Sequence, residues 1–183
     1  MKSAADTIRS RRTVHDFRPG ETPPVEVVEA AMEHAIWAPN HHLSQPWRFR
    51  LLGPQTREKV CLLGAELTRA KGGDRKADHK LQRWREVPGW LLLSCTRSDD
   101  PIREREDFAA CCCAAQNLML YLWEQGIGVK WTTGEVTRDA RFFEITGIDP
   151  AAETPVGLFW YGYAAAVPET ARTPAAERLT RLP

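Results

Sequence analysis

The stretch Ala38-Pro39-Asn40-His41-His42-Leu43-Ser44-Gln45-Pro46-Trp47-Arg48-Phe49 gathers more functional groups than any other part of the chain. Pro39 and Pro46 restrict the backbone on either side of a short loop that holds imidazole, amide and hydroxyl side chains. From Trp47 to Leu52, alternating residues predict a strand with one buried face. A loop that is both stiff and polar is better suited to hold a polar, planar ligand than merely to join two elements.

Helical and strand patterns follow one another irregularly on both sides of this loop. The apolar stripe from Val28 to Ala35 predicts a helix that Thr22 caps, with the next two prolines in its first turn. Further helices are expected at 4–10, 55–70, 103–125 and 137–146, and further strands at 90–95, 129–133 and 156–163. The polar stretch 71–80 predicts a flexible lid or a solvated loop. A mixture without regular β–α–β order favours an α+β domain of three layers.

The composition restricts the class of protein. The 183 residues suit one domain, 1–183, whose end from about residue 164 to 183 is expected to be an extended arm. With 25 basic and 24 acidic residues, the chain shows no electrostatic preference for nucleic acid or an anionic membrane. No apolar run reaches the roughly 20 residues of a transmembrane helix, and Met1–Asp6 lacks the apolar block of a signal peptide. A cytoplasmic protein is therefore expected.

The five cysteines fit the same compartment. Cys111, Cys112 and Cys113 are consecutive in a predicted helix, where successive side chains point about 100° apart and do not converge on one metal. Cys61 and Cys95 lie in apolar surroundings. We therefore expect buried free thiols that act as small apolar groups.

Arg11, Arg12 and Thr13 offer two guanidinium groups and a hydroxyl just beyond the first predicted helix. This combination suits a phosphate, because arginine binds phosphate oxygens in a planar, bidentate way. The alternative is a solvated basic segment that complements the dipole at the end of the helix. The residues alone leave both interpretations open.

The polar loop and a later strand end also admit two interpretations. His41 and His42 could bind a metal, but no HExxH, His-Asp pair or CxxC accompanies them, so hydrogen bonding to a heterocycle or to backbone is favoured. Gln45 has a donor and an acceptor on one planar group, which matches the edge of a flavin or nucleobase, or it stabilises the loop itself. Trp131–Gly134 could place an aromatic face and two hydroxyls against a planar ligand, or could be an ordinary strand end.

No set of acid, base and nucleophile is visible that would do chemistry unaided. Gly126-Ile127-Gly128 follows a predicted helix rather than opening one, so it is not a dinucleotide fingerprint. The chain has no Walker motif and no GxSxG elbow. A cofactor would therefore have to supply the reactivity.

Four segments, in order, resemble the nitroreductase family of FMN-dependent NAD(P)H oxidoreductases, in its short bacterial form. Arg11-Arg12-Thr13-Val14-His15-Asp16-Phe17 is similar to the family's Arg-Arg-Ser-x-Arg-x-Phe, and Ala38–Trp47 is similar to its Ala-Pro…Gln-Pro-Trp. Ala115–Gly128 is similar to its Ala-x-Gln-Asn…Gly-Leu-Gly helix, and Leu158–Gly162 to its late strand. The resemblance implies a three-layer α/β/α fold with a central mixed, largely antiparallel sheet, in a homodimer with FMN at its interface.

The resemblance also implies which residues contact FMN. Arg11–Thr13 would hold the phosphate and ribityl end, and Arg172 would meet the phosphate as well. His41 and Gln45 would contact the ribityl chain or the ring edge, and Trp131–Gly134 would reach the flavin from the other subunit. The full set of implied cofactor contacts is Arg11, Arg12, Thr13, Trp37, Asn40, His41, Gln45, Trp131, Thr132, Thr133, Gly134 and Arg172.

Three positions depart from the family pattern. Thr13 replaces serine, which keeps the hydroxyl. His15 stands where arginine is usual, so a cationic role there depends on pH. Thr132 stands where short relatives often carry arginine, which affects the expected contact at the flavin edge.

The implied reaction is a ping-pong transfer of electrons. NADH or NADPH would transfer hydride to FMN and leave, and an electron-poor acceptor such as a nitroaromatic, a quinone or an enone would then take the electrons. No side chain is expected to be an obligatory proton donor, so no catalytic residue and no metal is assigned. Two alternatives stay open: a flavin-storing or flavin-sensing protein would be yellow without turnover, and a hydrolase with a metal at His41 and His42 would be colourless and contain zinc.

Overall fold

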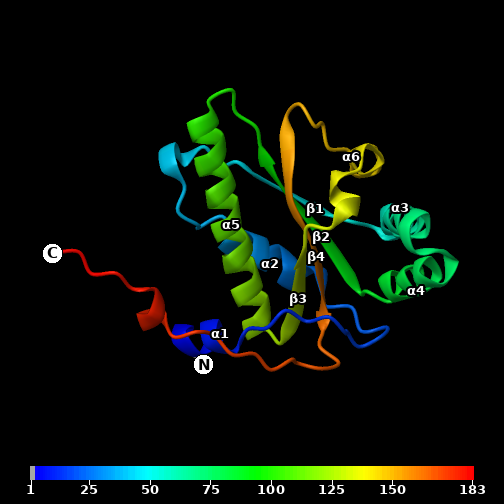
Figure 1. Cartoon of the computed structure of the whole chain (residues 1–183), viewed down its shortest axis with the longest axis horizontal. Helices are drawn as coiled ribbons and strands as arrows, with labels where there is room; N and C mark the ends of the chain where they lie inside the picture. The colour runs from blue at the N-terminus through cyan, green and yellow to red at the C-terminus, as the bar shows by residue number, and fades with distance from the viewer. Residues whose placement is uncertain (1–2) are drawn as a thin grey trace.

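The computed structural model describes residues 3–183, in which six α-helices surround one four-stranded sheet (Figure 1). The helices are α1 (Ala4–Ser10), α2 (Val25–Ala35), α3 (Pro54–Gly72), α4 (Asp74–Arg85), α5 (Pro101–Glu124) and α6 (Ala140–Thr146). The strands are β1 (Trp47–Leu51), β2 (Gly89–Thr96), β3 (Ile127–Thr132) and β4 (Glu153–Tyr163). The short 3-10 turns are η1 (His41–Leu43), η2 (Glu135–Arg138) and η3 (Ala175–Arg178).

The sheet has the strand order β1-β2-β4-β3, and each neighbouring pair is antiparallel. The central strand β2 is almost continuously apolar because helices cover both faces of the sheet. Parallel pairing within residues 3–183 is confined to a bridge between Thr13 and Val129, at the outer edge of β3. The expected three-layer α+β fold is confirmed, and its four strands pair in antiparallel fashion throughout.

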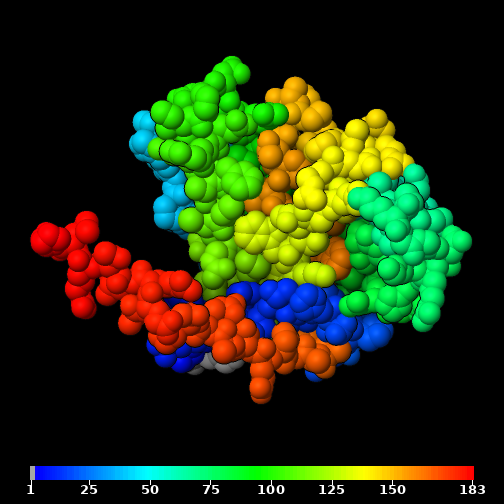
Figure 2. All heavy atoms as spheres, in the orientation of Figure 1, coloured from blue at the N-terminus to red at the C-terminus, as the bar shows by residue number. Residues whose placement is uncertain are grey.

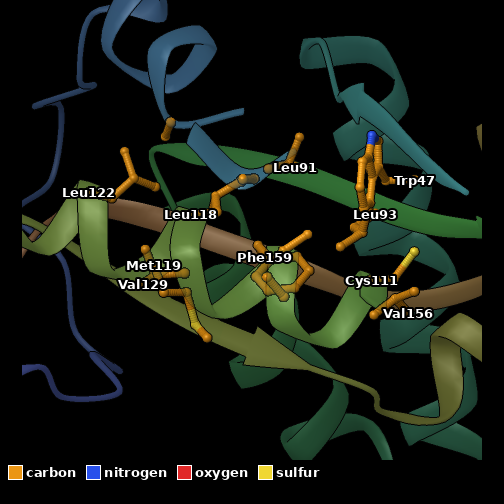
Figure 3. Packing of buried hydrophobic residues seen from close by; sticks show 14 of the residues in the cluster. Trp47, Leu91, Leu93, Cys111, Leu118, Met119, Leu122, Val129, Val156 and Phe159 are labelled. Carbon is orange, nitrogen blue, oxygen red and sulfur yellow. The ribbon is translucent and has the colours of Figure 1, made fainter. Parts of the chain in front are cut away.

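Alternate residues of β2 separate the two layers of the core. Leu91 and Leu93 face α2 and α5, where they pack in one cluster with Leu118 (Figure 3). Trp90 and Leu92 belong to a second cluster, which α3, α4 and α6 cover. Figure 1 shows α5 on one side of the sheet and α3, α4 and α6 on the other.

The longest helix of the described chain, α5, begins and ends at local signals. The side chain of Asp100 accepts a hydrogen bond from the backbone N–H of Ile102, Pro101 occupies the first turn, and Gly126, with a φ of 78°, follows the end. Small buried side chains between Ala110 and Ala115 let the helix approach the sheet closely. The helix expected at 103–125 is therefore confirmed.

The stretch 71–80, expected to be a flexible lid or a solvated loop, is mostly helical. α3 continues into it, Gly73 turns the chain with a φ of 77°, and α4 begins at Asp74. α4 packs on α3 so closely that a Cβ on Gly64 would lie 2.3 Å from a ring carbon of Trp84. The expectation was wrong because α4 buries only a narrow stripe, so its sequence is polar although its backbone is regular.

Two helix starts also differ from expectation. The helix expected at 137–146 is divided, because η2 covers its first residues and the side chain of Asp139 caps the start of α6. α2 begins at Val25 with Pro24 before it, so the prolines precede the first turn. Thr22 lies outside this cap, and no side chain caps α2 by a hydrogen bond.

The cysteines divide by exposure. Cys61, Cys95 and Cys111 are buried, Cys112 is half-buried and Cys113 is exposed. Burial raises the pKa of the Cys61 thiol to about 12, so it stays protonated at neutral pH. The expectation of buried thiols is right for the first three and wrong for Cys113, because one face of α5 remains open to solvent.

The end of the chain lies outside the sheet. Ala164 bridges Phe17, and the residues from 165 to 183 are exposed, with η3 as one helical turn. This segment passes along the N-terminal segment and then leaves the body of the molecule (Figure 1, Figure 2). Among residues 3–183, no helix combines the length and apolar character needed to cross a bilayer.

Candidate functional site

Three arginines gather beside α1. Arg11 follows the last turn of α1, and its guanidinium lies within electrostatic reach of Arg12 and Arg172. Burial, and then repulsion by these two neighbours, lowers the pKa of Arg11. Arg12 donates to the carbonyl of Arg9 at 2.6 Å and Arg172 to the hydroxyl of Thr170 at 2.8 Å, and none of the three pairs with a carboxylate between residues 3 and 183. Guanidinium groups without a counter-charge favour an anion, and their planar forks match a phosphate.

The chain after these arginines runs along the outer edge of β3. Thr13 pairs with Val129, and the backbone N–H of Val14 donates to the Val129 carbonyl at 3.1 Å. This approach requires glycine at position 128, because a Cβ on Gly128 would lie 2.4 Å from a methyl carbon of Val14. Thr13 remains exposed. The segment Trp131–Gly134 continues from the same strand, so the arginines and this segment lie along one edge of a single chain.

A pocket of about 150 Å³ adjoins this edge on the side of α4. His15 and Lys130 line it from the N-terminal segment and β3, and Lys80 and Arg83 line it from α4. Trp160 also lines the pocket; it is 6% exposed, and its indole Nε1 has no hydrogen-bond partner among the described residues. The basic groups that line the pocket fit a ligand that is rich in acceptor atoms.

No carboxylate from residues 3–183 lines the pocket, although Asp16 just outside it pairs with Arg83 at 3.2 Å. Burial lowers the pKa of Lys80 and of Lys130, whose ammonium groups lie 4.5 Å from the ring centre of Trp84 and 4.7 Å from that of Trp160. Repulsion by Arg83 lowers the pKa of Lys130 further. A ligand that brings negative charge into the pocket would relieve this repulsion.

No motif in the sequence marks Lys80, Arg83, Lys130 or Trp160 as site residues. They come from α4, β3 and β4 and meet only because these elements pack together. The one signal nearby is His15, which departs from the family motif and lines the same pocket. These residues therefore had to be found from the fold.

The loop 40–45 is held by side chains that fold inward. Asn40 Oδ1 accepts from the Gln45 N–H at 2.7 Å, and Asn40 Nδ2 donates to Ser44 Oγ at 2.9 Å. Ser44 Oγ donates in turn to Asp107, a carboxylate of α5 that is 5% exposed. These bonds stabilise three non-glycine residues with positive φ in the loop. Asn40 is thus committed to the loop, whereas the side chain of Gln45 is exposed.

The histidines next to Asn40 lie at the surface. His41 Nδ1 lies 2.7 Å from Glu106 Oε2, and the ring of His41 stacks on His42 with ring centres 3.8 Å apart. Trp37 is 85% exposed. No group of three or more His, Cys, Asp or Glu within residues 3–183 is arranged to hold a metal ion. The part of the candidate site around the loop 40–45 therefore exposes the aromatic rings of Trp37, His41 and His42 to solvent.

Trp131 makes its contacts inside the protein. Its Nε1 donates to the Val156 carbonyl at 3.1 Å, and its ring stacks on Phe159 at 5.3 Å. Thr132 is half-buried, whereas Thr133 and Gly134 are exposed. Of the segment expected to face a ligand, its last two residues are the most accessible.

The arginines and the loop 40–45 stand at opposite ends of α5 (Figure 1). Near the C-terminal end, Trp123 Nε1 donates to Ser10 Oγ at 3.0 Å, directly before the arginines. Near the N-terminal end, Asp107 holds the loop. The part of α5 between Asp107 and Trp123 is about 24 Å long. One chain therefore does not bring the two halves of the expected site together.

Fold and site define a three-layer α+β protein with a group of arginines along one edge of its sheet and a pocket lined by basic side chains beside it. The model of the Nitroreductase family matches residues 8–163, which is most of the chain. The chain belongs to the nitroreductase family.

Its relatives cover nearly the whole chain. The Bacillus subtilis protein YfhC, which bears the name of an NAD(P)H nitroreductase, is 31% identical over 182 residues, 97% of this chain and 93% of YfhC. A solved nitroreductase-like protein of Bacillus cereus is 30% identical, with a TM-score of 0.86 over 100% of this chain and 97% of that chain. A Desulfovibrio desulfuricans structure, described as a nitroreductase in complex with FMN, is 24% identical, with a TM-score of 0.78 over 100% and 99% of the two chains. This last likeness concerns the fold.

Proposed function

We propose that this chain is an FMN-dependent oxidoreductase that takes electrons from NADH or NADPH and passes them to an electron-poor acceptor. The observation that carries the proposal is the group of arginines without counter-charge, which leads along β3 to a pocket lined by basic side chains. FMN joins a phosphate to a ring rich in acceptor atoms, so its two ends match these two places. The FMN in the Desulfovibrio desulfuricans structure and the name of YfhC support the same function.

The chain's own residues would hold the cofactor along this edge. Arg11 and its neighbours Arg12 and Arg172 bind the phosphate, whose charge removes the repulsion among them. The exposed hydroxyl of Thr13 bonds the ribityl chain. Lys130 and the other basic groups of the pocket donate hydrogen bonds to acceptor atoms at the edge of the flavin ring. Their positive charge favours negative charge on the ring.

Bound FMN supplies the redox chemistry, because it can accept hydride from NAD(P)H and give electrons to an acceptor in a separate half-reaction. The residues around it contribute orientation, hydrogen bonds and positive charge rather than an obligatory proton. His41→Gln and His42→Gln should therefore keep the rate of FMN reduction by NAD(P)H within about threefold of wild type, as anaerobic stopped-flow absorbance would measure. Loss of reduction in either variant, with FMN still bound, would refute this point.

The assembly we propose is a homodimer in which the second copy supplies the loop 40–45. The arginines and this loop are separated by about 24 Å of α5 within one chain, so a single mononucleotide touches both only if they come from different copies. Trp37 and Leu43, 85% and 78% exposed, support an interface at this end. The partner would thus provide the loop, whereas Trp131–Gly134 acts with the arginines of its own chain. This reverses the arrangement that the sequence resemblance implies.

The absorbance spectrum of the purified protein tests the proposal directly. We expect flavin bands, rebinding of FMN after its removal, and oxidation of NAD(P)H that depends on an added acceptor. Double-reciprocal plots at several acceptor concentrations should give parallel lines, as a ping-pong cycle requires. Absence of bound and rebindable FMN would refute the proposal. Flavin binding without donor oxidation would favour a storage or sensing protein instead.

A further inference from the structure

The outer side of α4 carries two basic side chains, those of Arg75 and Lys76, that the proposed flavin site does not use. Arg75, Lys76 and His79 are exposed there, and together with Asp78 and Gln82 they line an open hollow of about 660 Å³. These five residues are called the α4 face below. Figure 2 shows α4 at the surface, on the side of the molecule away from the C-terminal arm.

Two acidic side chains, Asp78 in the α4 face and Asp74 beside it, are already neutralised by an arginine. Arg69 of α3 pairs with Asp74 at 2.7 Å and with Asp78 at 3.2 Å. Arg75 and Lys76, in contrast, form no ion pair with any residue from 3 to 183. The α4 face therefore has uncompensated positive charge, which attracts anions.

The α4 face adjoins the proposed flavin pocket. His79 lines both the hollow and the pocket to which Lys130 and Trp160 contribute. Along α4, Lys80 of the pocket and Lys76 of the α4 face are about one helical turn, or 6 Å, apart. An electron donor such as NADH or NADPH, with its nicotinamide ring at the pocket, can therefore place another of its groups on the α4 face.

We propose that Arg75 and Lys76 bind the 2′-phosphate of NADPH and thereby make NADPH the preferred electron donor. This inference rests on the proposed function, which leaves the choice between NADH and NADPH open. The two donors differ only in this phosphate, so a protein that prefers NADPH needs a cationic surface within reach of the flavin. A guanidinium binds phosphate oxygens through two parallel hydrogen bonds, and an ammonium adds a point charge.

Steady-state kinetics of FMN-loaded Arg75→Gln and Lys76→Gln test this assignment. Each substitution should lower kcat/KM for NADPH about tenfold, mainly by raising KM. The kcat/KM for NADH should change by less than about twofold. Lys59→Gln removes an exposed lysine from α3 and should leave both donors unchanged. Equal losses with both donors, or a wild-type protein that uses NADH as efficiently as NADPH, would overturn the proposal.

A binding measurement reports on the α4 face without turnover. By calorimetry, adenosine 2′,5′-bisphosphate should bind the FMN-loaded protein more tightly than adenosine 5′-monophosphate. The difference should shrink as sodium chloride is added and disappear when Arg75→Gln and Lys76→Gln are combined. Equal affinity of the two nucleotides for wild type would overturn the proposal. A protein that neither binds FMN nor oxidises a donor would refute the proposed function, whereas an active flavoprotein that does not discriminate the nucleotides would refute only this inference.

Discussion

Asp107 shows how one buried side chain sets the shape of the loop before β1. Its carboxylate is 5% exposed, accepts from Ser44 Oγ, and lies 3.4 Å from Asn40 Nδ2 and 3.7 Å from Arg103 Nε. Removing it would leave polar groups of the loop without their partner, which costs on the order of 1–3 kcal/mol for each buried group. The loop would then relax from its positive-φ backbone.

We therefore expect Asp107→Ala to lower the free energy of unfolding by about 2–4 kcal/mol and to raise the Kd for FMN about tenfold or more. Asp107→Asn keeps an acceptor oxygen and should show smaller changes in both quantities. Chemical denaturation and FMN fluorescence titration measure the two effects. Glu124→Ala, at the exposed far end of α5, is the matched control. Equal FMN affinity in Asp107→Ala and wild type would contradict the role of Asp107.

Among the elements, the contact between the N-terminal segment and β3 depends on one glycine. A Cβ on Gly128 would lie 2.4 Å from Val14 Cγ2, and Val14 is fully buried, so it has little room to move. Gly128→Ala should lower the free energy of unfolding by about 1–3 kcal/mol through this overpacking. FMN binding should weaken too, because Thr13 and the arginines shift with Val14. Thermal unfolding and FMN titration check both effects.

The control for this overpacking is Gly53→Ala. Gly53 precedes α3 and has no atom within 4 Å of the position that a Cβ would take. It should therefore change stability by only a few tenths of a kcal/mol, about the scale of a cap substitution from glycine. If Gly128→Ala were as stable as Gly53→Ala, the segment at Val14 would be held more loosely than the packing indicates.

An ion pair also ties strands together across the sheet. Arg50 of β1 lies 2.7 Å from Glu153 of β4 and donates to Ser94 of β2 at 2.9 Å. Hydrogen bonding from Arg50 holds the pKa of Glu153 below its usual range, although burial opposes this. Because the pKa is lower in the folded state, the pair stabilises the fold above the unfolded pKa of about 4.3. That stability is lost as the pH falls through the lower, folded-state pKa.

Glu153→Gln should accordingly lower the free energy of unfolding by about 1–2 kcal/mol at pH 7 and have less effect at pH 3. Urea unfolding across this pH range gives the two curves to compare. Glu177→Gln, on the exposed C-terminal arm, should follow wild type throughout. Parallel curves for wild type and Glu153→Gln would show that the pair does not contribute to acid sensitivity.

For the molecule as a whole, the proposed site needs two copies, and mixed dimers can test this. Arg11→Gln and Asn40→Ala should each inactivate both sites of a homodimer. A mixed dimer would contain one site with both changes and one intact site, so random mixing should restore about a quarter of wild-type activity. Arg11 and Arg12 belong to the same half of the proposed site, so every site of an Arg11→Gln and Arg12→Gln mixed dimer carries one of the changes. Mixing these two variants should therefore restore no activity. If native mass spectra showed mixed dimers of Arg11→Gln and Asn40→Ala but activity did not recover, the shared site would be refuted.

Local patterns predicted most of the fold. The bounds of α1, the extent of α5 to within two residues, and the positions of β2 and β4 follow from caps, prolines and apolar runs that act within a few residues. α4 was missed because it has a polar surface and packs through few side chains, chiefly Ala77 and Trp84. Of the proposed site, Arg11–Thr13 could be named from a motif. Lys130 and Trp160 could not, because nothing in their own neighbourhood marks them.

The chain's local patterns and motifs thus sufficed for most of its elements, though not for α4, and for its family and its candidate phosphate ligands. The packed fold was needed to learn that Arg11 and the loop 40–45 stand at opposite ends of α5, and that the Trp131 indole bonds within its own chain. It was also needed to bring Lys130 and Trp160 against α4. Caps and periodicities act between residues close in sequence, whereas these placements depend on how α5 and α4 pack on the sheet. No local pattern encodes that packing.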